Sequence, residues 1–436
     1  MKNAAGRHFI CVLLASYLIS GLAEARPYVA FGELRGHIAP CGCDPATDLG
    51  GVRRIGAVIG DYQARASELL ILSLGNNLPE KEDRVKHAAM MMFEKELGSH
   101  AILFNTLDER FYLQTTKIAK ASSSGSLPYV LSQKDRPKGV FFAIENKGHK
   151  IFGYRSREDK APPLASWGEA IGKSRGKSFL LFSGSIKDLK AIKKARLFNT
   201  ILLANSTPLG TEANHLEKNE PGRLLKEGVY MVPAFGTGVV RSVSLKRKKL
   251  PLFGEKQKAG LSFEKALPLV FLDRQYERGE KVKKTLSFYK KGAIALFEQK
   301  AQRRKKDLPK SPFAGAAACK GCHPSSYQIW MKTSHASAYG TLEKNKVDKD
   351  PECVSCHVLG YDKKGGFADK ESSPQFAGVQ CENCHGAAAS HVKNPGVKPK
   401  KKAESSCILC HKMPHSSAFD YDKYWPKIEH GARKGI

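Results

Sequence analysis

The feature that most constrains this chain is a cysteine and histidine pattern near its C-terminal end. Cys-x-x-Cys-His occurs four times within about a hundred residues. Two thiols three positions apart reach the two vinyl groups on one porphyrin edge, and the next residue places an imidazole under the iron, so this is the c-type haem attachment pattern. The cysteines are Cys319, Cys322, Cys353, Cys356, Cys381, Cys384, Cys407 and Cys410. The sequence therefore predicts four covalent haem c groups, with proximal ligands His323, His357, His385 and His411.

A zinc site or a thiol redox pair is the alternative interpretation, because Cys-x-x-Cys also serves both. Four copies, each followed by histidine, fit it poorly. Zinc binds four ligands, which would leave the four motif histidines unexplained.

Four further histidines follow residue 313, which matches four irons with two axial positions each. Coordination by two histidines closes both faces of a haem and suits electron transfer. The candidate distal ligands are His335, His391, His430 and His415. His415 follows its own motif so closely that reaching the opposite face of that haem is awkward. For each of the four, the alternative is a surface histidine.

Residues 313–436 hold few residues per haem, so we expect a mainly α-helical domain whose core is supplied by the haem groups. Glycine and proline clusters such as Gly365-Gly366 and Asn394-Pro395-Gly396 predict loops between short helices.

The segments around these motifs resemble the tetrahaem cytochrome c family typified by the electron acceptor of hydroxylamine oxidoreductase. The resemblance is carried by Tyr327-Gln328-Ile329-Trp330, Ser334-His335-Ala336-Ser337-Ala338-Tyr339, Pro351-Glu352-Cys353 and Val379-Gln380-Cys381-Glu382-Asn383-Cys384-His385-Gly386. It implies closely stacked haem pairs, two histidine ligands at most irons, and distal ligands at His335 and His391. In the founding member one haem has an open face. The leading hypothesis is an electron carrier, and the alternative is an enzyme that converts a small nitrogen or sulfur species at an open haem.

The first residues have the pattern of a secretory signal: Lys2 and Arg7, an apolar stretch, and Ala23-Glu24-Ala25 as a cleavage site. We expect residues 1–25 to be removed and the protein to be periplasmic. The alternative is an uncleaved membrane anchor, but the apolar stretch is short for a span.

Residues 26–272 alternate apolar runs with amphipathic ones, which indicates an α/β domain. The predicted strands are 67–74, 100–104, 139–144, 178–182, 200–203, 229–232 and 239–245. The predicted helices are 51–66, 81–97, 109–121 and 186–196.

The opening of this domain resembles exported relatives of 5′-nucleotidases, which have an α/β sandwich of metallophosphoesterase type. The likeness runs from Gly32-Glu33-Leu34 through Pro40-Cys41-Gly42-Cys43 to Gly50-Gly51-Val52-Arg53-Arg54. An active two-metal site needs motifs that are absent here: there is no Asp-x-His, Asn76 stands where a bridging aspartate is expected, and no histidine follows Asn105. We therefore predict a degenerate scaffold, and the alternative is an exported phosphohydrolase fused to a cytochrome.

Cys41 and Cys43 remain after the haem cysteines and the signal-segment Cys11 are set aside. An oxidising compartment favours a disulfide. The alternative is a pair of metal ligands completed by His37 or a distant group.

A basic helix is expected in the linker, residues 273–312. Its apolar face is formed by Val282, Leu286, Tyr289, Ala293 and Leu296, and it ends in Arg303-Arg304-Lys305-Lys306. Of the net charge of +30, residues 313–436 carry only +6 and the upstream part +24. The upstream surface is thus expected to attract an acidic redox partner or anionic lipid. Nucleic acid is not an expected partner of an exported protein.

Overall fold

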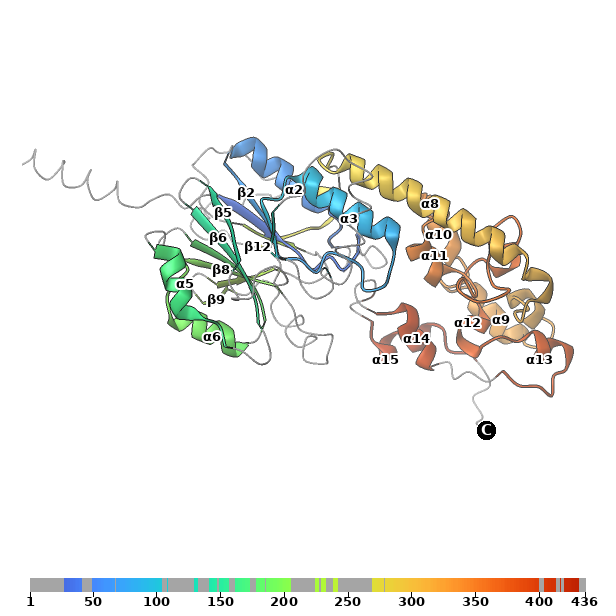
Figure 1. Ribbon diagram of the computed structural model, residues 1–436. Helices are drawn as coiled ribbons and strands as arrows, with labels where there is room; N and C mark the ends of the chain where they lie inside the picture. Colours follow the sequence, from blue (N-terminus) through green and yellow to red (C-terminus); the bar gives the residue numbers. More distant parts are fainter. Residues whose placement is uncertain are drawn as a thin grey trace, which may run out of the picture. The chain divides into compact units, whose positions relative to one another are not determined.

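The computed structural model describes residues 27–40, 49–66, 68–103, 108, 129–131, 141–146, 149–156, 161–172, 178–184, 186–204, 224–226, 229–232, 238–241, 269–277, 279–399, 404–412, 416 and 419–430. These residues form two compact units that divide mainly between Val282 and Lys283 (Figure 1). The predicted signal segment, the helix expected at 109–121, Cys41, Cys43, Asn105 and His415 lie outside the described residues. No helix in the described ranges is long and apolar enough to cross a membrane.

The first sheet of the N-terminal unit has the strand order β12-β11-β1-β2-β3-β4. Its strands are β1 (Tyr28–Phe31), β2 (Leu70–Ser73), β3 (Ala101–Leu103), β4 (Tyr129–Leu131), β11 (Gly238–Arg241) and β12 (Leu269–Phe271). Strands β1 to β4 run parallel, and β11 and β12 add antiparallel strands at one edge.

The second sheet has the order β5-β6-β7-β8-β10-β9. Its strands are β5 (Phe141–Asn146), β6 (His149–Arg155), β7 (Ser178–Ser183), β8 (Thr200–Leu203), β9 (Leu224–Lys226) and β10 (Val229–Met231). The inner four are parallel, and β5 and β9 close the two edges as antiparallel strands.

The side chains of β7 show how the layers pack, because successive residues of a strand point to opposite faces. Phe179 and Leu181 join Leu72 in the core between the two sheets. Leu180 and Phe182 pack on the other side with α5 (Leu164–Ile171) and α6 (Ile186–Lys194). The helices α2 (Val52–Arg65) and α3 (Arg84–Leu97) belong to the first sheet's side, where the rings of Phe31 and Phe93 meet edge to face at 5.6 Å (Figure 1). The predicted α/β sandwich is confirmed.

The predicted strands over 67–74, 100–104, 139–144, 178–182, 200–203, 229–232 and 239–245 correspond to β2, β3, β5, β7, β8, β10 and β11. Strands β1, β4, β6, β9 and β12 and helix α5 were not predicted from the sequence. Strand β6 contains His149, Lys150 and Arg155, and these charges obscure its apolar pattern. Short edge strands contain too few residues to show the alternation of apolar and polar side chains that identifies a strand.

The C-terminal unit consists of helices and turns in its described part, as predicted. The helices are α8 (Lys283–Lys305), α9 (Pro324–Met331), α10 (Ala338–Asn345), α11 (Pro351–His357), α12 (Cys381–His385), α13 (Ala389–Lys393), α14 (Glu404–Cys410) and α15 (Tyr421–Tyr424). Short 3-10 turns include η6 (Ala316–Cys319) and η8 (Trp425–Lys427).

Helix α8, expected in a linker, contributes to the core of this unit. Its Phe297 and Ala301 are buried in one cluster with residues of α10, α11 and the following loop. The buried row is Thr285, Tyr289, Ala293, Phe297 and Ala301. This row repeats every four residues, so the predicted face is rotated: Leu286 and Leu296 lie half-buried at its border.

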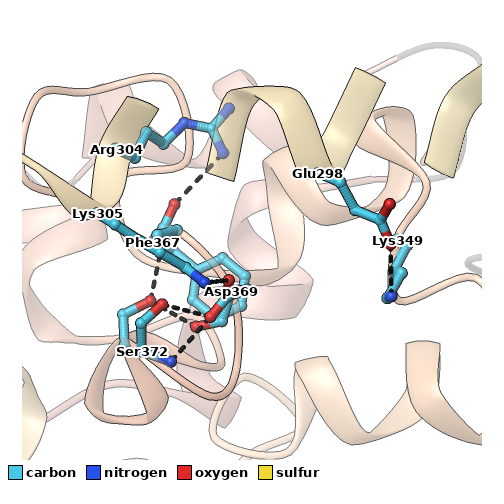
Figure 2. A network of polar contacts seen from close by, with 9 residues as sticks. Glu298, Arg304, Lys305, Lys349, Phe367, Asp369 and Ser372 are labelled. Atoms are coloured by element: carbon cyan, nitrogen blue, oxygen red, sulfur yellow. Dashed lines mark hydrogen bonds and ion pairs between the residues drawn. The ribbon is translucent and has the colours of Figure 1, made fainter. Parts of the chain in front are cut away.

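The basic end of α8 is partly engaged within this unit, as Figure 2 shows. The Arg304 guanidinium lies 3.8 Å from the centroid of the Tyr361 ring, and it donates to the Phe367 carbonyl. The Lys305 ammonium lies 2.8 Å from the Asp369 carboxylate. Arg304 and Lys305, two residues of the predicted basic end of α8, therefore form contacts within the C-terminal unit.

Candidate haem centres

The four Cys-x-x-Cys-His motifs lie on short local structures. The second and third are helical throughout, in α11 and α12. The fourth has its cysteines in α14, and the first has Cys319 at the end of η6. Helical residues three apart share a face, so both thiols of a motif are presented together.

Three histidines outside the motifs each lie opposite a motif histidine. The ring centroids are 6.3 Å apart for His323 and His391, 6.1 Å for His411 and His335, and 5.9 Å for His385 and His430. A ring nitrogen lies about 2 Å from a metal that it binds, and the ring centre roughly 1 Å further. Two imidazoles sharing one iron are thus expected to have centroids roughly 6 Å apart. The three pairs have the spacing of axial ligands.

The outer ring nitrogens also fit iron coordination. His357 Nδ1 lies 2.8 Å from the Ala338 carbonyl oxygen, His430 Nδ1 2.7 Å from that of Ile428, and His391 Nδ1 3.1 Å from that of Val397. A ligating histidine usually donates its second N–H to such an acceptor, which leaves Nε2 for the metal. Burial is the main cause that lowers the pKa of His335, His385 and His411, which favours the neutral imidazole that binds iron.

Cysteines of different motifs touch each other. The Cys319 and Cys381 thiols hydrogen bond, which lowers the pKa of Cys381 and raises that of Cys319. The thiols of Cys356 and Cys410 do the same, which lowers the pKa of Cys356 to about 6 and raises that of Cys410. These values concern free thiols, before any thioether bond forms. The first motif is therefore next to the third, and the second next to the fourth.

Large parts of this unit lack an apolar core made of protein. Helices α9, α13 and α15 bury no residue. Short helices are marginal in water without tertiary packing. Among the described residues, the exposed large apolar side chains all lie here: Ile329, Met331, Val392, Val397, Ile408 and Leu409. An apolar cofactor at each motif would cover such surface, so the residues present fit haem.

The second motif differs from the others. In the described part of the chain, no second imidazole is stacked against His357. His415, the remaining predicted distal ligand, lies outside the described residues.

In the N-terminal unit, a network of polar side chains lies where metal ligands would be expected. Asn76, which stands where a bridging aspartate is expected, donates from Nδ2 to Glu33 Oε1 at 3.0 Å. Arg35 Nη2 lies 3.4 Å from Glu33 Oε2, so a guanidinium stands beside this carboxyl group where a metal ion would be expected. Asp108 accepts hydrogen bonds from the backbone N–H groups of Asn76 and Leu78. Glu33 and Arg35 were not predicted as site residues. Two charged residues directly after an apolar strand could have indicated a polar site at the end of that strand.

In the described ranges no three His, Cys, Asp or Glu side chains are arranged to hold a metal ion. The network continues to Glu94, which is 3% exposed and accepts from Ser73, Asn77 and Ser99. Burial raises the pKa of Glu33 to about 8 and that of Glu94 to about 7, against the effect of their hydrogen bonds.

Residues 318–386 match the family of cytochrome c554 and c-prime. The match includes the first three motifs and His335. A cytochrome c-554 from Nitrosomonas europaea is 37% identical over 91 residues, which covers 17% of this chain and 39% of that protein. The C-terminal unit thus has the sequence of a haem-binding c-type cytochrome, as its motifs predicted, and the chain spans well under half the length of this relative.

Solved structures similar to the chain include phosphoesterases. A 5′-nucleotidase precursor from Thermus thermophilus has 17% identity and a TM-score of 0.39, over 62% of this chain and 59% of that one. A putative 5′-nucleotidase from Staphylococcus aureus has 12% identity and a TM-score of 0.41, over 81% and 70%. A calcineurin-like phosphoesterase from Bacillus subtilis has 12% identity and a TM-score of 0.33, over 61% and 98%. The α/β sandwich itself is established by the strand order and packing described above.

Proposed function

We propose that this protein is an exported electron carrier with four haem c groups, each attached through one Cys-x-x-Cys-His motif. The observation that carries the proposal is the set of three imidazole pairs, each joining a motif histidine to a histidine elsewhere. When bound, haem supplies one-electron iron chemistry. The cysteines would attach it, and at three motifs the paired histidines would hold its iron.

The pairs suggest which distal ligand serves which motif. His391 is assigned to the first motif, His430 to the third and His335 to the fourth. For the second motif, His415 is the remaining candidate. Closed axial positions leave no site for a substrate at these irons, which favours electron transfer over bond chemistry.

The contacts between cysteines of different motifs support a path for electrons. They bring the attachment site of the first motif to that of the third, and that of the second to that of the fourth. We infer that electrons pass most readily within these two pairs.

A haem enzyme is the second candidate function, and the surroundings of His357 favour it. If His415 does not reach this motif, the second haem has an open face where a small nitrogen or sulfur species can bind. The two functions differ in the spin state of this haem.

The upstream unit is proposed to dock a redox partner. Residues 1–312, which contain this unit and also α8 of the C-terminal unit, carry a net charge of +24; this suits an acidic protein or an anionic membrane surface, and the leader pattern suits the periplasm. A phosphohydrolase is disfavoured because Arg35 and Asn76 occupy positions around Glu33 that metal binding would need. Purified protein is expected to show no phosphatase or nucleotidase turnover with manganese or zinc. Robust turnover that Asp108→Ala abolishes would restore the hydrolase hypothesis.

The central test is the haem count. Haem should stay on the polypeptide through acid-acetone extraction, and the pyridine haemochrome spectrum should give four haems per chain. Low-temperature electron paramagnetic resonance should then show only low-spin ferric haem. A count of two or fewer, or bound zinc, would refute the proposal. One equivalent of high-spin haem that binds nitrite or hydroxylamine rapidly would favour the enzyme.

A further inference from the structure

The third motif contains a buried carboxylate between its two cysteines. Glu382 is 3% exposed. Its Oε1 accepts from the backbone N–H of Ala388 at 2.7 Å, and its Oε2 accepts from that of Gly315 at 2.7 Å. Both oxygens also lie within 3.1 Å of the Ala314 nitrogen. These donors come from two segments distant in sequence, so one side chain ties both to the third motif.

Each of these segments serves the first motif. Ala314 and Gly315 lead directly into η6, which ends at Cys319. Gly315 has φ +80°, a conformation that favours glycine and lets its N–H turn toward the carboxylate. Ala388 immediately precedes α13, the helix that carries His391. Glu382 thus binds the backbone segment before the first motif, which contains His323, and the backbone segment before α13, which contains His391.

Two neighbouring side chains extend this arrangement. Gln380 accepts from the Ala316 N–H at 2.7 Å through Oε1. Asn383 donates to the carbonyl of Val358, the residue after His357, at 3.0 Å. Polar side chains in and beside the third motif therefore contact the backbone shortly before the first motif and directly after the second.

The hydrogen-bond partners of Glu382 match those of a carboxylate. An ionised carboxylate only accepts hydrogen bonds, and each contact described above comes from an N–H donor. Among the described residues, Glu382 forms no ion pair with a basic side chain. It also lies close enough to Cys319 and Cys381 to act electrostatically on both. A buried negative charge is therefore next to two haem attachment sites.

We propose that Glu382 is a positioning residue that aligns His391 with His323 and lowers the reduction potentials of the haems at the first and third motifs. This inference rests on the proposed function. Reduction adds one electron to a ferric haem, Fe(III) + e⁻ → Fe(II), and so removes one positive charge. A fixed anion nearby stabilises the more positive ferric form, and screening by solvent is weak in a buried site.

Two variants of the full-length, haem-loaded protein separate alignment from charge. Glu382→Gln has nearly the same shape but no charge. Glu382→Asp keeps the charge but is one methylene shorter, so it no longer reaches both segments. Glu371→Gln, at an exposed carboxylate of the same unit, is the matched control for charge. His391→Ala identifies the first haem, because removal of its ligand makes that haem high-spin.

Spectroelectrochemical titration and low-temperature electron paramagnetic resonance are the measurements. In Glu382→Gln, two of four transitions, including the one marked by His391→Ala, should move to higher potential, while Glu371→Gln leaves all four near the parent values. In Glu382→Asp, the potentials should stay near the parent values, while the low-spin signal of the first haem changes or gains a high-spin component.

Several results would overturn the inference. One is a Glu382→Gln titration that matches Glu371→Gln. Another is equal loss of all four haems, or of folded protein, in both Glu382 variants, because this would assign the residue to general folding. A parent protein without covalent haem would instead refute the proposed function, before any variant is made.

Discussion

At the scale of single residues, the histidine pairs give each distal candidate a specific partner. His335 faces His411 and His391 faces His323, although each follows a different motif more closely in sequence. Sequence distance therefore does not identify the haem that a distal histidine serves.

Replacing a distal histidine should open one defined haem. In His335→Ala, all four haems should remain covalently bound, while the haem at Cys407 and Cys410 becomes high-spin and binds carbon monoxide. Its potential should shift, because axial ligands set it. His37→Ala, in the N-terminal unit, is the control. A variant with unchanged low-spin signals would contradict the pairing.

The buried carboxylate Glu94 predicts a pH-dependent stability of the N-terminal unit. Its folded pKa is raised from 4.5 to about 7, so folding favours the protonated form. This contribution is present in full below pH 4.5 and is lost as the pH rises through about 7. The loss is on the order of 3 kcal/mol. Denaturant unfolding across this range should show the decline, and Glu94→Gln should reduce its slope; the remaining slope is expected from Glu33, whose pKa is raised to about 8. An equal slope in both proteins would assign the effect to other groups.

At the scale of elements, α8 packs against the other helices of the C-terminal unit and forms part of its core. The ring of Phe297 stacks on that of Tyr361 with centroids 6.2 Å apart, and Tyr289 donates to Asp350, whose side chain caps α11. This helix therefore supports the second motif directly.

Truncating Phe297, the buried aromatic residue of α8 that stacks on Tyr361, should destabilise the C-terminal unit. Phe297→Ala should lower its free energy of unfolding by about 3–5 kcal/mol, the range for a buried aromatic side chain. Lys349→Ala removes an exposed ion pair with Glu298 of the same helix and should cost less than about 1 kcal/mol. Denaturant titration followed by haem absorbance measures both. Similar costs for the two variants would show that α8 is held by surface charge instead.

At the scale of the whole molecule, the two units obtain their cores differently. The N-terminal unit has apolar clusters between its sheets and beneath its helices. In its described part, the C-terminal unit has a protein core centred on α8, α10 and α11, while α9, α13 and α15 bury nothing.

Protein made without haem attachment should therefore have a folded N-terminal unit and a partly unfolded C-terminal unit. Hydrogen exchange followed by mass spectrometry should show protection in the N-terminal sheets and rapid exchange in α9, α13 and α15. The haem-loaded protein, under identical conditions, should be protected in both units. Equal protection of these helices with and without haem would show that the chain supplies their core by itself.

The sequence by itself determined the haem chemistry of the C-terminal unit and the α/β class of the N-terminal one. Attachment motifs and apolar strands are local patterns, and neighbouring residues are enough to define them. The tertiary structure decided which histidines face each other, that Arg35 and Asn76 surround Glu33, and that α8 is a core helix. It also decided that Glu382 joins segments 68 and 6 residues away. Such contacts arise when distant segments pack, and no local pattern of residues specifies their partners.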